Sequence, residues 1–139
     1  MKKSILMVLA LLLVCSTSVV SAMDVDIAPD SLNTLSNRNY ITCYLEYPEG
    51  DINAIDIPTL ELQVEKNSIP VDTEAPATLG DYDNDGVPDL MVKFFVKGIL
   101  YEYFKAEGDY QLQIRGDLVT GESVWGWDII WLFKSGKPL

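Results

Sequence analysis

The chain has 139 residues, 48% of them hydrophobic, and its 21 Asp and Glu residues against 10 Lys and Arg give a net charge of −11. The hydrophobic fraction excludes an intrinsically disordered chain, and the negative charge excludes nucleic acid as a partner, because binding DNA or RNA requires a basic surface. The sequence has no histidine, no serine-based nucleophile motif and no phosphate-binding loop, so we expect a protein that is not an enzyme.

Residues 1–22 have the three parts of a secretory signal peptide. Two lysines precede an apolar run over residues 5–15, and small residues follow up to Ala22. The run is too short to span a bilayer, and the small-x-small pattern predicts cleavage after Ala22. We therefore expect a protein that is secreted or exposed at the cell surface, with no stable transmembrane anchor. An uncleaved segment that serves as an anchor is the alternative.

The two cysteines fall on either side of this cleavage site. Acylation of Cys15, as in a lipoprotein, is disfavoured because Val14 stands where a small residue is expected. Removal of Cys15 leaves Cys43 alone, so the mature domain has no internal disulfide. Cys43 alternates in phase with Ile41 and Leu45, which predicts a buried small hydrophobic residue rather than a reactive thiol.

The mature chain, residues 23–139, has 8 basic and 21 acidic residues and a net charge of −13. Alternation of apolar and polar residues predicts strands at 24–27, 40–47, 60–65, 90–96, 110–114 and 123–133. Helical spacing over 99–104 predicts one short helix. The segments 30–39 and 67–79 are expected to be loops. Short strands separated by turns predict a single all-β domain, an Ig-like β-sandwich of about seven strands.

Between two of these strands, residues 81–89 have the pattern of a calcium loop. Aspartates stand at the first, third, fifth and ninth positions of this segment, and Gly86 stands at its sixth position. Carboxylates at this spacing converge on one point, where oxygen ligands suit Ca²⁺. The glycine permits a sharp turn that a residue with a Cβ resists. The predicted ligands are the side chains of four aspartates and one backbone carbonyl: Asp81, Asp83, Asp85, Val87 and Asp89.

The loop departs from a complete EF-hand. Val92 stands at the twelfth position, where that motif has a bidentate glutamate, and a strand-forming run follows in place of a helix. The loop is therefore expected to be the EF-hand-like calcium loop of a β-protein, as in dockerin-like and integrin-type repeats. Water or a distant acid has to replace the glutamate, and Asp72, Glu74 and Asp128 are the candidates. The alternative is an acidic turn that binds no metal.

The last predicted strand is apolar on both faces. One face continues the core with Ile130 and Leu132, and the other carries a row of mostly aromatic side chains: Trp125, Trp127, Ile129, Trp131 and Phe133. Large apolar patches are uncommon on the surface of monomers. Either a neighbouring segment covers the row, or the row is exposed. If it is exposed, we expect Trp125, Trp127 and Trp131 to form a binding face for a protein, a sugar chain or a membrane interface.

The chain resembles a family of small secreted β-sandwich domains common in methanogenic archaea and some bacteria. The similarity covers nearly the whole mature chain, and its segments are 25–33, 41–62, 80–94, 116–118 and 126–130. Its most specific part is 80–94, a DxDxDGxxDL calcium-type loop followed by a strand. The resemblance implies a structural or adhesive module of cell-surface or extracellular proteins. The final strand is far more aromatic here than the polar version in the family.

These patterns together predict a secreted, calcium-binding β-sandwich module with a structural or adhesive role at the cell surface. Calcium is the expected cofactor. The alternative is a carbohydrate- or surface-binding module that uses the tryptophan row, and its partner is then a surface protein or a polysaccharide.

Overall fold

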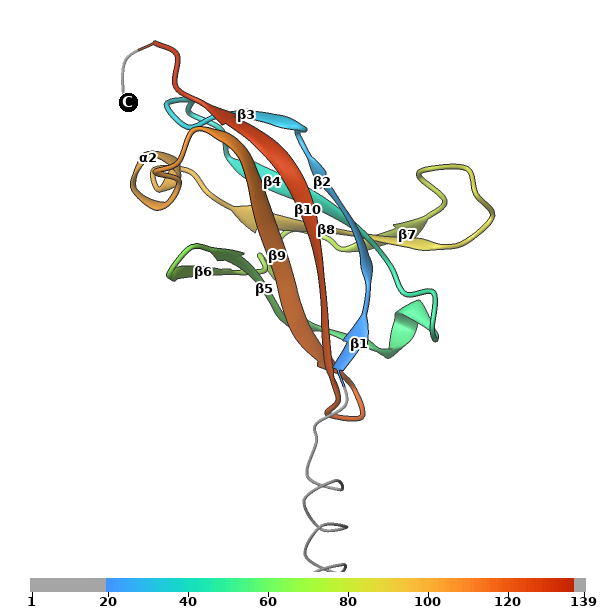
Figure 1. The fold of residues 1–139 in the computed structure, drawn as a ribbon. Coiled ribbons are helices and arrows are strands. Elements are labelled where there is room, and N and C mark those ends of the chain that lie inside the picture. The colour runs from blue at the N-terminus through green and yellow to red at the C-terminus, as the bar shows by residue number, and fades with distance from the viewer. Residues whose placement is uncertain (1–19, 137–139) are drawn as a thin grey trace, which may run out of the picture.

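The computed structural model describes residues 20–136, which form two β-sheets packed face to face (Figure 1). The six-stranded sheet consists of β1 (Val20–Ala22), β3 (Ser31–Asn33), β5 (Ile55–Val64), β6 (Asn67–Pro70), β9 (Gly108–Leu118) and β10 (Ser123–Phe133). The four-stranded sheet consists of β2 (Asp24–Ala28), β4 (Tyr40–Glu46), β7 (Thr78–Gly80) and β8 (Asp89–Phe95). A 3-10 turn, η1 (Ile52–Ala54), and a short helix, α2 (Leu100–Tyr103), lie in the connections.

The strand order is that of an immunoglobulin-like sandwich. The smaller sheet runs β2-β4-β8-β7, and the larger sheet runs β1-β10-β9-β5-β6, with β3 also beside β10. In an immunoglobulin domain the first, second, fifth and fourth strands form one sheet, and the third, sixth and seventh form the other. Strands β2, β4, β8 and β7 take the first set of positions, and β5, β9 and β10 take the second. The expected all-β, Ig-like sandwich is therefore confirmed.

The six strands predicted by alternation are all present, as is the short helix at α2. Four short strands were missed, so the described residues form ten strands and not about seven. One of the four is β1, which lies at the end of the predicted signal peptide. The segment predicted as a loop over 30–39 contains β3, and the one over 67–79 contains β6 and β7. These loop predictions were wrong at those positions because a strand of three or four residues shows too little alternation to be recognised.

The N-terminal segment crosses from one sheet to the other along the edge of β10. Strand β1 pairs with the start of β10, β2 pairs with β4 in the smaller sheet, and β3 returns to pair with the end of β10. Near the end of β2, before the segment returns to β10, the N–H of Ile27 donates a hydrogen bond to Asp128 Oδ2 (2.8 Å). A Cβ at Gly126 would collide with the carbonyl oxygen of Met23, so the glycine allows the close crossing.

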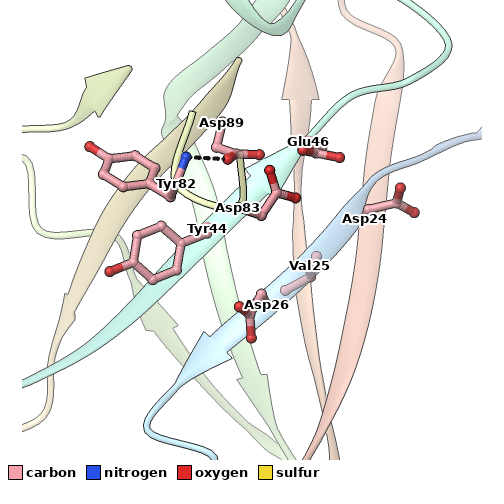
Figure 2. Close-up of a pocket in the computed structure, with 8 residues that line it drawn as sticks. All are labelled: Asp24, Val25, Asp26, Tyr44, Glu46, Tyr82, Asp83 and Asp89. Atoms are coloured by element: carbon pink, nitrogen blue, oxygen red, sulfur yellow. Dashed lines mark hydrogen bonds between the residues drawn. The ribbon is translucent and has the colours of Figure 1, made fainter. Parts of the chain in front are cut away.

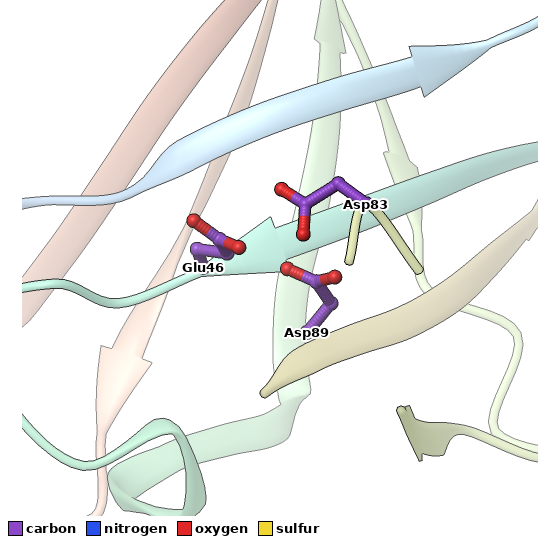
Figure 3. Close-up of side chains that lie close together, drawn as sticks. All are labelled: Glu46, Asp83 and Asp89. Carbon is purple, nitrogen blue, oxygen red and sulfur yellow. The ribbon is translucent and has the colours of Figure 1, made fainter. Parts of the chain in front are cut away.

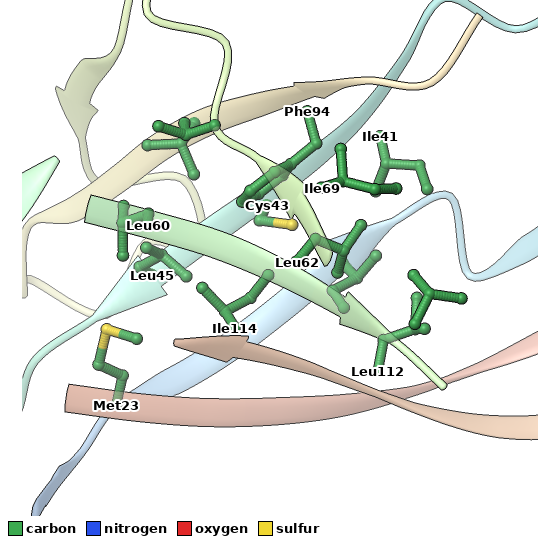
Figure 4. Packing of buried hydrophobic residues seen from close by; sticks show 14 of the residues in the cluster. Met23, Ile41, Cys43, Leu45, Leu60, Leu62, Ile69, Phe94, Leu112 and Ile114 are labelled. Carbon is green, nitrogen blue, oxygen red and sulfur yellow. The ribbon is translucent and has the colours of Figure 1, made fainter. Parts of the chain in front are cut away.

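The core lies between the sheets and is built from alternate residues of their strands (Figure 4). On β4 the buried residues are Ile41, Cys43 and Leu45, each fully buried. Leu62 of β5 and Ile114 of β9 face them from the larger sheet. Cys43 is a free cysteine whose pKa is raised by burial. The prediction of a buried, unreactive Cys43 is thereby supported, because the thiolate is the reactive form.

Residues 1–19 of the predicted signal peptide (residues 1–22), Cys15 among them, lie outside the described residues. The last three residues of this peptide form β1, which pairs in parallel with Ser123–Trp125. Over residues 20–136 no helix is long and apolar enough to cross a membrane. Cleavage after Ala22 would remove β1, which is the only strand of the structure that lies within residues 20–22.

Candidate metal centre

The loop that connects β7 to β8 spans residues 81–88 and turns sharply at two positions. Asn84 and Gly86 have positive φ angles of 58° and 82°. Glycine adopts such angles without steric cost, and asparagine tolerates them better than most other residues. A Cβ at Gly86 would meet no atom within 4 Å. The glycine is therefore required by its backbone angle and not by a lack of space.

Backbone N–H groups of the loop hold three aspartates close together. Asp81 accepts hydrogen bonds from the N–H groups of Asp85 (3.1 Å) and Gly86 (2.9 Å). Asp83 accepts one from Asp85 (3.3 Å), and Asp85 accepts one from Val87 (2.8 Å). One carboxylate oxygen from each aspartate lies within 4.8 Å of the others. Three predicted ligands thus meet, and Val87 follows in the same loop with an exposed side chain.

A second acidic group joins this loop to the four-stranded sheet. One carboxylate oxygen each from Glu46, Asp83 and Asp89 lie within 4.8 Å of one another (Figure 3). Glu46 is the last residue of β4, and Asp89 is the first residue of β8, its antiparallel neighbour. Asp89 is only 3% exposed. Because Asp83 belongs to both groups, the two groups are contiguous.

Glu46 is the carboxylate of these groups whose buried oxygen lacks a hydrogen-bond donor in the described part of the chain. Its Oε1 atom is buried and has no hydrogen-bond partner among the described residues. The adjacent Asp89 carboxylate, burial and the nearby Asp85 raise the pKa of Glu46 to about 8. In contrast, the backbone N–H of Val87 lowers the pKa of Asp85. Carboxylates placed this close repel one another unless one of them is protonated or a cation lies between them.

The group of Glu46, Asp83 and Asp89 lines a cleft of about 350 Å³ (Figure 2). Its lining contains five carboxylates and neither lysine nor arginine: Asp24, Val25, Asp26, Tyr44, Glu46, Tyr82, Asp83 and Asp89. The ring of Tyr82 lies 4.9 Å from that of Tyr44, measured between centroids, and its N–H donates to Asp89 Oδ2 (2.8 Å). Tyr82 therefore fixes the loop against both β4 and β8.

Sequence reasoning found four of the five acidic residues in the two groups and missed Glu46. The three acids suggested in its place belong to neither group. Asp72 accepts a hydrogen bond from the N–H of Glu74 (3.0 Å), and Asp128 accepts one from Ile27. No local sequence signal identifies Glu46, because only the pairing of β4 with β8 brings the end of one strand beside the start of the other.

The chemistry of the site suits a hard cation. All the side-chain donors are carboxylate oxygens, and oxygen ligands of this kind bind divalent cations such as Ca²⁺ and Mg²⁺. The five acids of the two groups come from three places in the chain: β4, the loop and β8. The acidic groups can therefore hold a metal ion that ties the loop to the sheet.

The tryptophan row lies on the outer face of the other sheet. The side chains of Trp127, Ile129 and Trp131 are 46%, 51% and 50% exposed. Trp125 and Phe133 are half-buried. Of the two alternatives that the sequence left open, the exposed row is the one observed.

Comparison of the chain with family models, with curated proteins and with solved structures finds no match. The resemblance to the small secreted domains of methanogenic archaea therefore stays a prediction. Among known groups, the chain is placed only by its architecture, an all-β sandwich with the strand order of an immunoglobulin domain.

Proposed function

We propose that the protein is a secreted module that binds Ca²⁺ between the 81–89 loop and β4. The observation that carries the proposal is the group formed by Glu46, Asp83 and Asp89. Its members come from two strands and a loop, and the buried Oε1 of Glu46 lacks a partner among the described residues. A divalent cation at this point neutralises carboxylates whose mutual repulsion otherwise opposes folding.

Glu46 takes the part that the twelfth-position glutamate plays in an EF-hand. In that motif the glutamate follows the loop in sequence and closes the coordination sphere. Here Val92 occupies that position and is buried, whereas Glu46 approaches the loop from the neighbouring strand. The proposed ligand set is the four loop aspartates, the carbonyl of Val87 and the carboxylate of Glu46.

Calcium is favoured over other metals by the donors and by the form of the loop. The chain has no histidine, and Cys43 is buried in the core. Residues 20–136 therefore offer neither an imidazole nor an accessible thiol, the ligands typical of zinc sites. Magnesium requires near-ideal octahedral geometry, whereas calcium accepts six to eight oxygens in flexible arrangements. Three of the aspartates are exposed, which suits a site that is loaded from an extracellular medium rich in calcium.

The role that follows is structural or adhesive. An ion held by β4, the loop and β8 stabilises the folded state, because it binds that state in preference to the unfolded chain. Extracellular calcium modules typically bind with Kd of about 10⁻⁴–10⁻³ M. Such a module is rigid outside the cell, where calcium is plentiful, and loosened where it is scarce.

Calorimetric titration of Ca²⁺ into chelator-treated protein tests the proposal. Wild type is expected to bind with a Kd of about 10⁻⁴–10⁻³ M. Asp83→Asn and Glu46→Gln are each expected to weaken binding by about tenfold or more, or about 1.4 kcal/mol. Asp72→Asn, a matched change outside the cleft, is the control and should bind as wild type does. A flat wild-type titration up to several millimolar would reduce the loop to an acidic turn.

A further inference from the structure

The exposed row on β10 consists of apolar side chains at alternate positions of the strand. Its alternate neighbours, Val124, Gly126, Ile130 and Leu132, are buried in the core. Residues four positions apart on a strand are separated by about 13 Å along the backbone, and Trp127 and Trp131 are placed in this way with Ile129 between them. Contiguous exposed apolar surface of this kind marks a binding site more often than it marks ordinary surface.

Polar side chains of β9 border the row on one side. The antiparallel register sets Gln113 opposite Trp127, Gln111 opposite Ile129 and Asp109 opposite Trp131. Residues directly opposite one another in an antiparallel pair share a face of the sheet. Gln113 is also paired with Gln63 of β5. The row is therefore bordered by two amide groups, which can both donate and accept hydrogen bonds, and by the carboxylate of Asp109.

At the end of β10 that lies beside β1, this face is hollowed by a cleft of about 500 Å³. The lining combines one aromatic ring with polar groups: Val20, Gln113, Arg115, Gly116, Asp117, Ser123, Val124 and Trp125. Arg115 donates to the side-chain oxygen of Gln113 (3.3 Å), which leaves most of its five N–H donors for a ligand. The charges of Arg115 and Asp117 cancel, so the lining is polar and has no net charge.

We propose that this face binds a neutral saccharide chain, with one sugar ring in the cleft against Trp125 and further rings along Trp127 and Trp131. A sugar ring presents an apolar C–H face that stacks on indole and a rim of hydroxyl groups that pair with amides, guanidinium and carboxylate. The cleft volume is in the range of small-molecule sites, about 300–1,000 Å³.

Charge separates this ligand class from the other candidates. The mature chain carries a net charge of −13, which repels nucleic acid, anionic lipid surfaces and acidic polysaccharides. A second copy of the chain would bring the same charge. A neutral saccharide meets no such repulsion and matches the uncharged lining of the cleft. Cleavage after Ala22 would remove Val20 from this lining and leave its other seven residues in the chain.

The test is a titration of the purified protein with four neutral hexasaccharides, namely cellohexaose, xylohexaose, mannohexaose and chitohexaose, followed by tryptophan fluorescence and calorimetry. At least one is expected to give saturable binding with a shift in tryptophan emission. Trp127→Ala and Gln113→Ala are expected to weaken that binding by about tenfold or more. Tyr101→Ala removes an exposed aromatic ring on α2, outside this face, and should bind as wild type does.

The outcomes distinguish saccharide binding from self-association of the protein and from calcium binding. Thermal melts of the variants confirm that each remains folded. The proposal is overturned if no sugar binds saturably at millimolar concentration, or if a folded Trp127→Ala variant binds as tightly as wild type. It is also overturned if light scattering shows a wild-type dimer that Trp127→Ala converts to a monomer, because the row is then a self-association face. The saccharide site needs no calcium ligand, so its failure leaves the calcium proposal intact.

Discussion

At the scale of single residues, Glu46 makes the stability of the cation-free protein depend on pH. Its pKa is raised from 4.5 to about 8, first by the neighbouring Asp89 and then by burial. The folded state therefore binds more protons than the unfolded state between these pH values. The protonated form of Glu46 contributes stability that is fully present below pH 4.5 and is lost as the pH rises through about 8.

Chelator-treated wild type is accordingly expected to lose thermal stability relative to Glu46→Gln as the pH is raised from about 5 to about 9. The glutamine variant keeps the shape of the side chain and has no charge to titrate. Saturating Ca²⁺ should reverse the order at high pH, so that wild type becomes the more stable protein. Thermal melts of both proteins across this range are the measurement. Parallel curves without calcium would show that Glu46 is not held in a protonated form.

Gly86 is predicted to be the least replaceable residue of the loop. Its φ of 82° strains any residue with a Cβ, at a cost of about 1–2 kcal/mol. Gly86→Ala should therefore lower the free energy of unfolding by about that amount. It should also weaken calcium binding, because relaxation of the strained φ angle turns the backbone N–H of residue 86 away from Asp81, which accepts its hydrogen bond. Urea denaturation and calorimetry measure the two effects.

Asn84→Gly is the matched control for this change. Asn84 has a φ of 58°, so glycine relieves strain there instead of adding it. We expect its stability to stay within about 0.5 kcal/mol of wild type. Equal losses of unfolding free energy in Gly86→Ala and Asn84→Gly would contradict this role of the positive φ angle at Gly86.

At the scale of elements, Asp128 links the N-terminal segment to the last strand. Its Oδ2 accepts the hydrogen bond of Ile27 N–H, at the point where the segment moves from one sheet to the other. Asp128→Ala leaves this N–H without its partner and should cost about 1–3 kcal/mol. Asp128→Asn keeps a carbonyl oxygen in the same place and should cost less. Urea denaturation distinguishes the two, and an alanine variant as stable as the asparagine variant would contradict this role.

Strands with a long alternating pattern could be predicted from the sequence. Strand β10 was predicted with the observed bounds, and β4 to within one residue at its end. The short strands β3 and β7 could not be predicted, because three residues carry too little pattern and form only by pairing with strands distant in sequence. Their existence depends on the tertiary fold.

The same limit applies to the site. The aspartates of the loop could be predicted because their spacing is local in the sequence. Glu46 could not, because alternation places it on the polar face of β4, where a solvated glutamate is the ordinary expectation. Only the pairing of β4 with β8 brings Glu46 beside Asp89. Strand pairing between distant segments cannot be predicted from a local sequence pattern.

At the scale of the whole molecule, the two sheets present different chemistry. The acidic cleft lies on the four-stranded sheet and its loop, and the aromatic row lies on the outer face of the six-stranded sheet. The core between them is continuous. An ion bound on one side can therefore stabilise the whole domain while the other side remains free for a ligand.

Calcium is thus predicted to stabilise the domain as a unit. At a concentration of 100 times Kd, a ligand that binds only the folded state adds about 2.7 kcal/mol to the free energy of unfolding. Urea denaturation of wild type with and without Ca²⁺ should show this gain, and Asp83→Asn, whose binding is weaker by about tenfold or more, should lose about half of it or more at the same calcium concentration. A gain of equal size in the variant would place the ion elsewhere.

The most direct measurement is a crystal structure of the protein grown with Ca²⁺, with anomalous data collected at long wavelength. The account predicts one strong anomalous peak that is coordinated by carboxylate oxygens of Asp83, Asp89 and Glu46, at the usual calcium distances of about 2.3–2.6 Å. A peak held by the loop aspartates without Glu46 would contradict the proposed closure from β4. No peak at all would contradict the metal site itself.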